Sequence, residues 1–202
     1  MKRGFYIIMA AQFFSSLADQ ALFVAAVQLL KADGAPAWQQ AALVPLFALF
    51  YVVLAPFVGA FADALPKGRV MLLSNGIKIA GCLMMLFGTH PLMSYAVVGL
   101  GAAAYSPAKY GILTELLPAS QLVKANGWIE GLTIASIILG VLLGGQLVGV
   151  RLSSMLLGFD FPFVDTGVDT PAEAAVSALI LVYLLAAWFN TRIPDTGVEM
   201  RP

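Results

Sequence analysis

The sequence predicts an all-α membrane protein with six transmembrane helices. Of its 202 residues, 60% are hydrophobic and only 11% are charged, and the mean hydropathy is +0.90. A soluble domain has about 45–50% apolar and about 25% charged residues. Several apolar segments are also long enough to cross a bilayer, for which a helix needs about 20 residues. Together these observations favour a membrane-spanning bundle over a soluble domain.

The first three expected spans are separated by turn residues. The span 5–30 follows Lys2 and Arg3 and is longer than the apolar region of a signal peptide, so we expect a helix and not a cleaved leader. The turn KADGAP then leads into the span 38–65, with Trp38 as an interfacial anchor. The turn LPKGR leads into the span 69–88.

Turn residues also separate the last three expected spans. The turn THP precedes the span 92–116, and the turn LPASQ precedes the span 122–150. A longer segment, 151–171, then leads to the span 172–190, where Trp188 is a second expected anchor.

The distribution of Lys and Arg predicts the orientation. If the N-terminus is cytoplasmic, the outside segments hold only Lys31 and Arg151 as basic residues. Basic residues are enriched in cytoplasmic loops, so we expect both termini in the cytoplasm. The outside loop 151–171 is acidic, which fits. The inside segments hold Lys2, Arg3, Lys67, Arg69, Lys124, Arg192 and Arg201.

Four expected spans contain an ionisable residue well inside their ends: Asp19, Lys78, Lys109 and Glu130. A charge at the bilayer centre costs at least ~2.5–3.5 kcal/mol, so such residues usually face a bundle interior or a water-filled cavity. The helical rise puts Asp19 and Lys78 near mid-membrane and the other two nearer the cytoplasm, so each acid matches one lysine in depth. The alternative is that these charges only pin helices together or snorkel to the interface.

Polar residues extend around these charges. Asn75 precedes Lys78 by three positions and Asn126 precedes Glu130 by four, which puts each pair on one helix face. Lys109 lies in YSPAKYG, where Pro107 frees a backbone carbonyl and is able to kink the helix. Interrupted helices near mid-membrane often line transporter sites.

Two glycine patterns predict packing or conformational roles. In GVLLGGQLVG, the pairs Gly140/Gly144 and Gly145/Gly149 have the spacing of close helix contacts. In GAFADALPKGR (59–69), small Gly59 allows a neighbouring helix to approach. One turn later, Asp63 is placed to accept hydrogen bonds from a basic group such as Lys67, near Arg69.

The residues for most catalytic chemistry are missing from the sequence. The lone Cys82 excludes an internal disulfide framework, and the lone His90 leaves little material for a metal site or a catalytic triad. The zero net charge gives no indication of nucleic-acid binding. We therefore expect no enzymatic activity, no cofactor and no metal.

Four segments carry a family resemblance. AQFFSSLADQAL, PKGRVMLLSNGIKIAG, GLGAAAYSPAKYGIL and LVKANGWIE are similar to the bacterial lysophospholipid transporter (LplT-type) family of the major facilitator superfamily. GAFADALPKGR also resembles the superfamily's loop 2–3 signature, although Ala64 stands where a basic residue is usual. The resemblance covers residues 5–150 and implies the N-terminal half of that fold. That fold has a second, C-terminal six-helix half, so we expect residues 1–202 to be an incomplete half: a truncated product, a fragment, or a half that pairs with the missing half as a separate partner or with a second copy.

The resemblance implies movement of lysophosphatidylethanolamine-type lipids across the bacterial inner membrane. A cytoplasmic acyltransferase/acyl-carrier-protein synthetase then re-acylates the lipid, whose acyl chain stays among membrane lipids. Asp19 would pair with the headgroup ammonium and Lys109 with the phosphate. The expected substrate-binding residues are Asp19, Lys78, Tyr105, Lys109, Asn126 and Glu130. The expected conformational-gating residues are Gly59, Asp63, Lys67, Arg69 and Pro107.

Two other functions fit the same pattern. One is a proton-coupled drug or metabolite exporter of the same superfamily, with Asp19 as the protonation site. The other is a non-transporting membrane scaffold for an acyltransferase, in which the intramembrane charges only hold helices together. Neutralising those charges would then leave partner binding unchanged.

Overall fold

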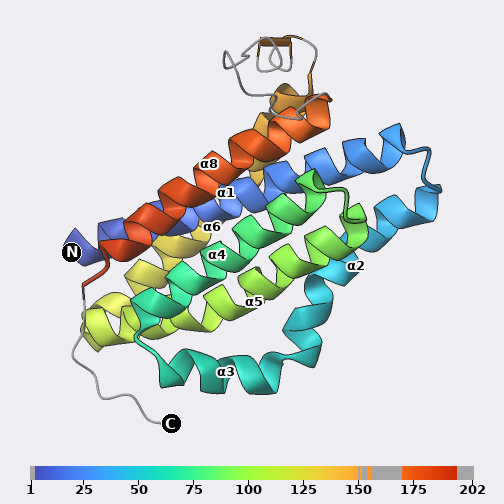
Figure 1. Ribbon diagram of the computed structural model, residues 1–202. Helices are drawn as coiled ribbons and strands as arrows, with labels where there is room; N and C mark the ends of the chain where they lie inside the picture. The colour runs from blue at the N-terminus through green and yellow to red at the C-terminus, as the bar shows by residue number, and fades with distance from the viewer. Residues whose placement is uncertain (1–2, 150, 152–153, 156–169, 195–202) are drawn as a thin grey trace, which may run out of the picture.

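The computed structural model describes residues 3–149, 151, 154–155 and 170–194, and the regular elements in these ranges are all α-helices (Figure 1). The all-α prediction is therefore confirmed. The acidic loop expected outside the membrane, with Asp160, Asp165 and Asp169, lies beyond the described residues. The helices are α1 (Arg3–Ala32), α2 (Ala37–Val53), α3 (Ala55–Ala64), α4 (Lys67–Leu86), α5 (Pro91–Leu116), α6 (Ala119–Val148) and α8 (Pro171–Thr191).

Four of these helices, α1, α4, α6 and α8, are long and apolar enough to cross a membrane. The pair α2 and α3 counts as a fifth span if the two are taken together. Helix α5 has 26 residues, but it is rich in glycine and alanine, carries Ser, Tyr and Lys side chains, and is largely buried. Its length suits a span, whereas its composition suits a helix surrounded by protein.

The expected span 38–65 is broken, and this corrects the prediction of one continuous helix. Helices α2 and α3 meet at Leu54 with a bend of 53°. Pro56, in the first turn of α3, has no backbone N–H to donate to the preceding turn. The chain therefore restarts its hydrogen bonding at Leu54, whose carbonyl accepts from Phe57 and Val58 at 2.9 and 2.8 Å.

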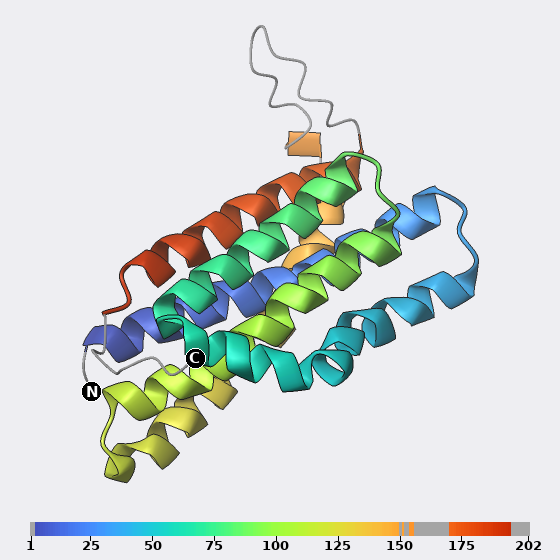
Figure 2. The same cartoon turned by 60° about the horizontal axis from the view of Figure 1, so that its bottom comes forward.

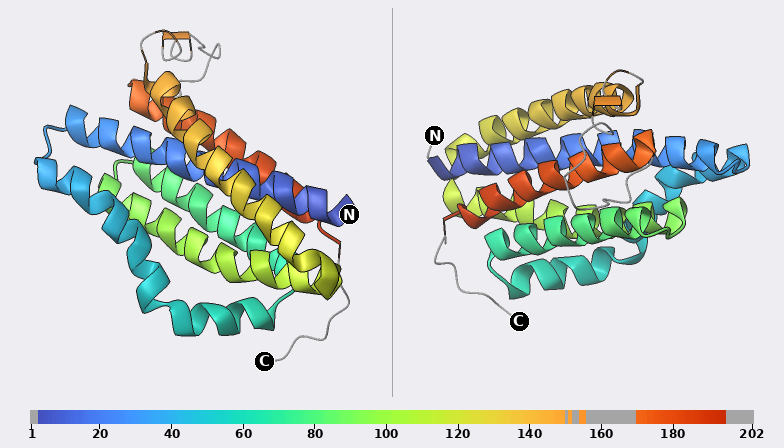
Figure 3. Two further views of the ribbon diagram at one scale, coloured as in Figure 1. Left: turned by 180° about the vertical axis from the view of Figure 1, so that it is seen from behind. Right: turned by 45° about the horizontal axis from the view of Figure 1, so that its top comes forward.

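The long helices lie side by side, and α3 turns away from them (Figures 1 and 2). The most extensive helix pairings are α4 with α5, α1 with α6, and α1 with α8. Seen from behind, α6 crosses α1, and the bend between α2 and α3 is plain (Figure 3). The start of α1 and the end of α8 lie at the same end of the bundle (Figure 1).

Local sequence fixes several helix ends. After α1 and α4 the chain turns at Gly34 and Gly88, with φ of 67° and 87°, a conformation that favours glycine. The Nδ1 atom of His90 accepts from the backbone N–H of Leu92 and so caps α5. Thr170 caps α8 in the same way through the N–H of Glu173.

The glycine predictions have mixed outcomes. Gly140 and Gly144 face α1 so closely that an added Cβ would lie 2.5 Å from the Leu17 carbonyl oxygen and 2.9 Å from Ala21 Cα. This confirms close packing for that pair. Gly145 meets no atom within 4 Å, so the second predicted pair makes no such contact. Nothing lies within 4 Å of a Cβ on Gly59 either, so the expected close approach there is wrong for the part of the chain described.

Two apolar clusters leave a polar layer between them. Along α1, one cluster uses Phe5 and Ile8, and the other begins at Ala18 and continues to Leu30. The polar residues of α1 lie at the junction, between positions 12 and 19. Each cluster excludes water from one end of the bundle, so the polar layer is held at mid-length.

Candidate functional site

A cavity of about 170 Å³ opens in this polar layer. Its walls come from α1, α2, α4, α5 and α6. Three of the predicted intramembrane charges line it, namely Asp19, Lys78 and Lys109. The other lining residues are Gln12, Ser16, Gln20, Phe47, Ala102, Tyr105, Ser106 and Thr133.

Asp19 and Lys78 form a buried ion pair. Lys78 Nζ lies 2.9 Å from Asp19 Oδ2, and the Tyr183 hydroxyl donates to Asp19 Oδ1 at 2.5 Å. The two charged residues are 8% and 2% exposed. The depth match of these two residues is confirmed here, because both lie near mid-length of their helices, α1 and α4.

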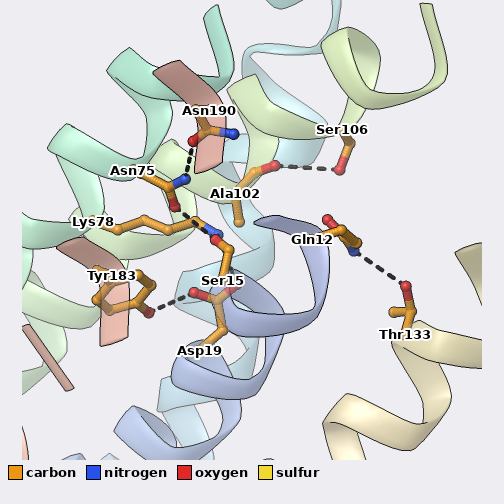
Figure 4. Close-up of polar contacts among 10 residues, drawn as sticks. All are labelled: Gln12, Ser15, Asp19, Asn75, Lys78, Ala102, Ser106, Thr133, Tyr183 and Asn190. Atoms are coloured by element: carbon orange, nitrogen blue, oxygen red, sulfur yellow. Dashed lines mark hydrogen bonds and ion pairs between the residues drawn. The ribbon is translucent and has the colours of Figure 1, made fainter. Parts of the chain in front are cut away.

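A chain of hydrogen bonds extends from the pair to α8 (Figure 4). Lys78 Nζ donates to Ser15 Oγ at 2.8 Å, and Ser15 Oγ donates to Asn75 Oδ1 at 2.7 Å. Asn75 Nδ2 in turn donates to Asn190 Oδ1 at 2.5 Å. These contacts join α1, α4 and α8 in one network, since buried polar groups need partners.

The network follows from simple helical spacings. Ser15 and Asp19 are four residues apart on α1, and Asn75 and Lys78 are three apart on α4, so each pair shares a face. Lys78 also lies near two tyrosine rings, with Nζ 5.2 Å from the ring centroid of Tyr105 and 5.9 Å from that of Tyr183. The ammonium is therefore surrounded by favourable partners.

Lys109 has a different environment. It is 5% exposed and lines the cavity, with Nζ 4.5 Å from the ring centroid of Tyr110. Within the described ranges, no carboxylate lies at ion-pair distance from it. Glu130, which matches Lys109 in depth, forms no direct ion pair with it: Glu130 lies on the exposed side of α6, accepts a hydrogen bond from Tyr110, and attracts Lys109 only at longer range. Asn126, one turn earlier, is exposed on that side too.

Four of the predicted gating residues lie on α3 and at the start of α4 and do not line the cavity, whereas Pro107 lies on α5 beside the lining residue Ser106. Lys67 Nζ is 3.1 Å from Asp63 Oδ1 and donates to the Ala62 carbonyl at 2.8 Å, so Asp63 does accept from a basic residue. Arg69 is exposed. Pro107 lies within α5, which continues unbroken to Leu116.

Several residues of the site were not singled out from the sequence. Gln12 Nε2 donates to Thr133 Oγ1 at 3.1 Å and so connects α1 to α6 beside the cavity. Tyr183 and Asn190 complete the network from α8. Their signal was present in the sequence, because they are seven residues apart on an otherwise apolar helix and therefore share a face.

The fold is a bundle of long, mostly apolar helices around a buried polar cavity. Residues 8–197 match the Major Facilitator Superfamily, and the chain belongs to that family. The fold is also similar to that of a bacterial homologue of the human lysosomal transporter Spinster, solved in an inward-facing, unoccupied conformation. The TM-score is 0.75 at 22% identity, over 100% of this chain and 46% of that one.

The sequence is also similar to proteins named lysophospholipid transporter LplT. The relative from Yersinia enterocolitica serotype O:8 / biotype 1B is 51% identical over 207 aligned positions, and the one from Yersinia pestis (strain Pestoides F) is 49% identical. Each alignment covers 100% of this chain and 46% of the relative. The chain thus spans about half the length of these curated relatives.

Proposed function

We propose that this chain forms one six-span half of a transporter that moves lysophospholipids across the bacterial inner membrane. The main evidence is the sequence identity to relatives that are named for this activity. It is about 50% over the whole chain. The cavity supports the proposal independently, because Lys109 offers a buried cation that no described carboxylate pairs with. The substrate class contains an anionic phosphate, which this ammonium is suited to bind.

The proposal also covers the path of the acyl chain, the orientation of the termini and the partners. The acyl chain would lie along exposed apolar faces such as Ile134, Ile138 and Leu142 on α6. Both termini would be cytoplasmic, consistent with the start of α1 and the end of α8 lying at the same end of the bundle (Figure 1). A cytoplasmic acyltransferase would consume the transported lipid, and a second half would complete the transporter.

Gating would involve the turn between α3 and α4. The Asp63–Lys67 ion pair is positioned to fix α3 against the start of α4, and Gly59 leaves open space beside α3 for another element. Arg69 would face the cytoplasm, and Pro107 would provide a flexible point in α5.

The test is conversion of radiolabelled lysophosphatidylethanolamine to diacyl lipid in spheroplasts that lack their own transporter but retain the acyltransferase. The chain is expressed alone and together with the C-terminal half of the Yersinia enterocolitica relative. We expect conversion in at least the second case, and loss of it in Lys109→Met. Lys124→Met, which removes an exposed lysine of α6, is the matched control and should convert normally.

Two results would contradict the proposal. No conversion in either case, with both halves verified in the membrane, would reject lysophospholipid transport. Equal conversion by the Lys109→Met variant and the unsubstituted chain would show that the cavity cation has no role in transport.

A further inference from the structure

We infer that Asp19 is a positioning residue that holds Lys78, and that it does not bind the amine of a lipid headgroup. The inference rests on the proposed function, and it assigns recognition of the lipid to its phosphate at Lys109. It differs from the role that the family resemblance implies for Asp19, and it follows from the contacts of the two buried charges.

The carboxylate of Asp19 is already engaged on both oxygens. Oδ2 accepts from Lys78 at 2.9 Å and Oδ1 accepts from Tyr183 at 2.5 Å, while the side chain is 11% exposed. A headgroup amine would have to replace Lys78 at Oδ2. That exchange would leave the Lys78 ammonium buried without its counter-charge, which is strongly unfavourable.

Lys78 is held in place from several sides. Ser15 accepts from its ammonium, and Ser15 is itself fixed through Asn75 to Asn190. The ring of Tyr105 lies on another side. Because α1, α4 and α8 all contribute to this arrangement, the ammonium is held against Asp19 and Ser15 of α1 (Figure 4).

The charges of the cavity wall then divide into a compensated pair and Lys109. Among the described lining residues, the ionisable ones are one carboxylate and two ammonium groups, so the wall has a net charge of +1. A phosphate at Lys109 neutralises that charge. An amine elsewhere on the headgroup finds no unpaired acid there, since Glu130 is exposed and bonded to Tyr110.

The test uses the purified chain in nanodiscs and two tritiated probes, lysophosphatidylethanolamine and lysophosphatidylglycerol, which differ in the amine. Dissociation constants and unfolding temperatures are measured for Asp19→Asn, Lys78→Met and the double variant, with Lys124→Met as control. Lys78→Met alone leaves a bare carboxylate in the wall, so we expect weaker binding of both lipids by about tenfold and a lower unfolding temperature.

Two results are expected from the other variants. The double variant should bind both lipids within about threefold of the unsubstituted chain. Removing both partners leaves no unpaired charge in the cavity wall, and the two substitutions are therefore expected to compensate each other. Asp19→Asn should change the ratio of the two dissociation constants by less than about twofold, since neither lipid uses that carboxylate. The control should match the unsubstituted chain.

Three outcomes would overturn the assignment or its basis. Selective weakening of the amine-containing lipid in Asp19→Asn would show that Asp19 binds the amine. If the double variant has the same dissociation constants and the same unfolding temperature as Lys78→Met, the role of Asp19 is not limited to compensating the charge of Lys78. Binding of neither lipid by the unsubstituted chain would overturn the proposed function and the headgroup part of this inference, while the unfolding temperatures would still decide the pairing.

Discussion

The contact between α1 and α6 at Gly140 allows a sharp test of the fold. A Cβ at this position would lie 2.5 Å from the Leu17 carbonyl oxygen and 2.8 Å from Gln20 Cβ, whereas real Cβ atoms essentially never approach within 3.0 Å. Gly140→Ala therefore forces the two helices apart by about half an ångström. Gly145→Ala is the matched control on the same helix, because nothing lies within 4 Å of its added methyl group.

The two substitutions share the gain in helix propensity, which is up to about 1 kcal/mol. Their difference isolates the overpacking cost, which we expect to be about 1–3 kcal/mol against Gly140→Ala. The measurement is unfolding in mixed micelles, followed by circular dichroism as the denaturing detergent is increased. Equal stability of the two variants would refute the close packing of α1 on α6.

Three further predictions follow from individual contacts. Tyr183→Phe removes the hydroxyl that donates to Asp19 Oδ1 and should lower the free energy of unfolding by about 1–3 kcal/mol, whereas Tyr110→Phe, at an exposed contact, should lower it less. Thr170→Ala removes the cap of α8 and should cost about 1 kcal/mol; an unchanged unfolding midpoint would show that the cap adds nothing. A fluorescent protein fused after residue 202 should fluoresce if the C-terminus is cytoplasmic, and an active periplasmic reporter at the same point would reverse the orientation.

The helical architecture was predictable because it depends on apolar length and turn residues, which are local properties. The bend at Leu54 was not predicted, because Pro56 is compatible with the first turn of a helix and a single apolar run continues through it. The composition of α5 also did not show how much of it is buried by its neighbours. These features depend on packing, which no local pattern contains.

For the site, the sequence predicted how deep each charged residue lies along its helix, but not which way its side chain faces. Depth paired Asp19 with Lys78 correctly, since both helices pass through the centre of the bundle. Depth did not show that Lys109 and Glu130 stay beyond ion-pair distance, because depth says nothing of rotation about a helix axis and Glu130 lies on the exposed side of α6. Rotation is fixed by contacts such as Gly140 on α1, and these require the assembled structure.

The two buried lysines differ in how their charge is compensated, and this difference bears most directly on function. Lys78 has a carboxylate at 2.9 Å, a hydroxyl at 2.8 Å and two aromatic rings, so its burial is explained within the chain. Lys109 is nearly as buried, yet among the described residues it has an aromatic ring and no paired carboxylate. Burying an ammonium group in the membrane costs about 2.5–3.5 kcal/mol. The simplest way to offset that cost is an anion that binds the ammonium during transport. Under the proposed function, the lipid phosphate would supply that anion at the cavity, and the cost of burying Lys109 and the affinity for the substrate would then have one physical origin.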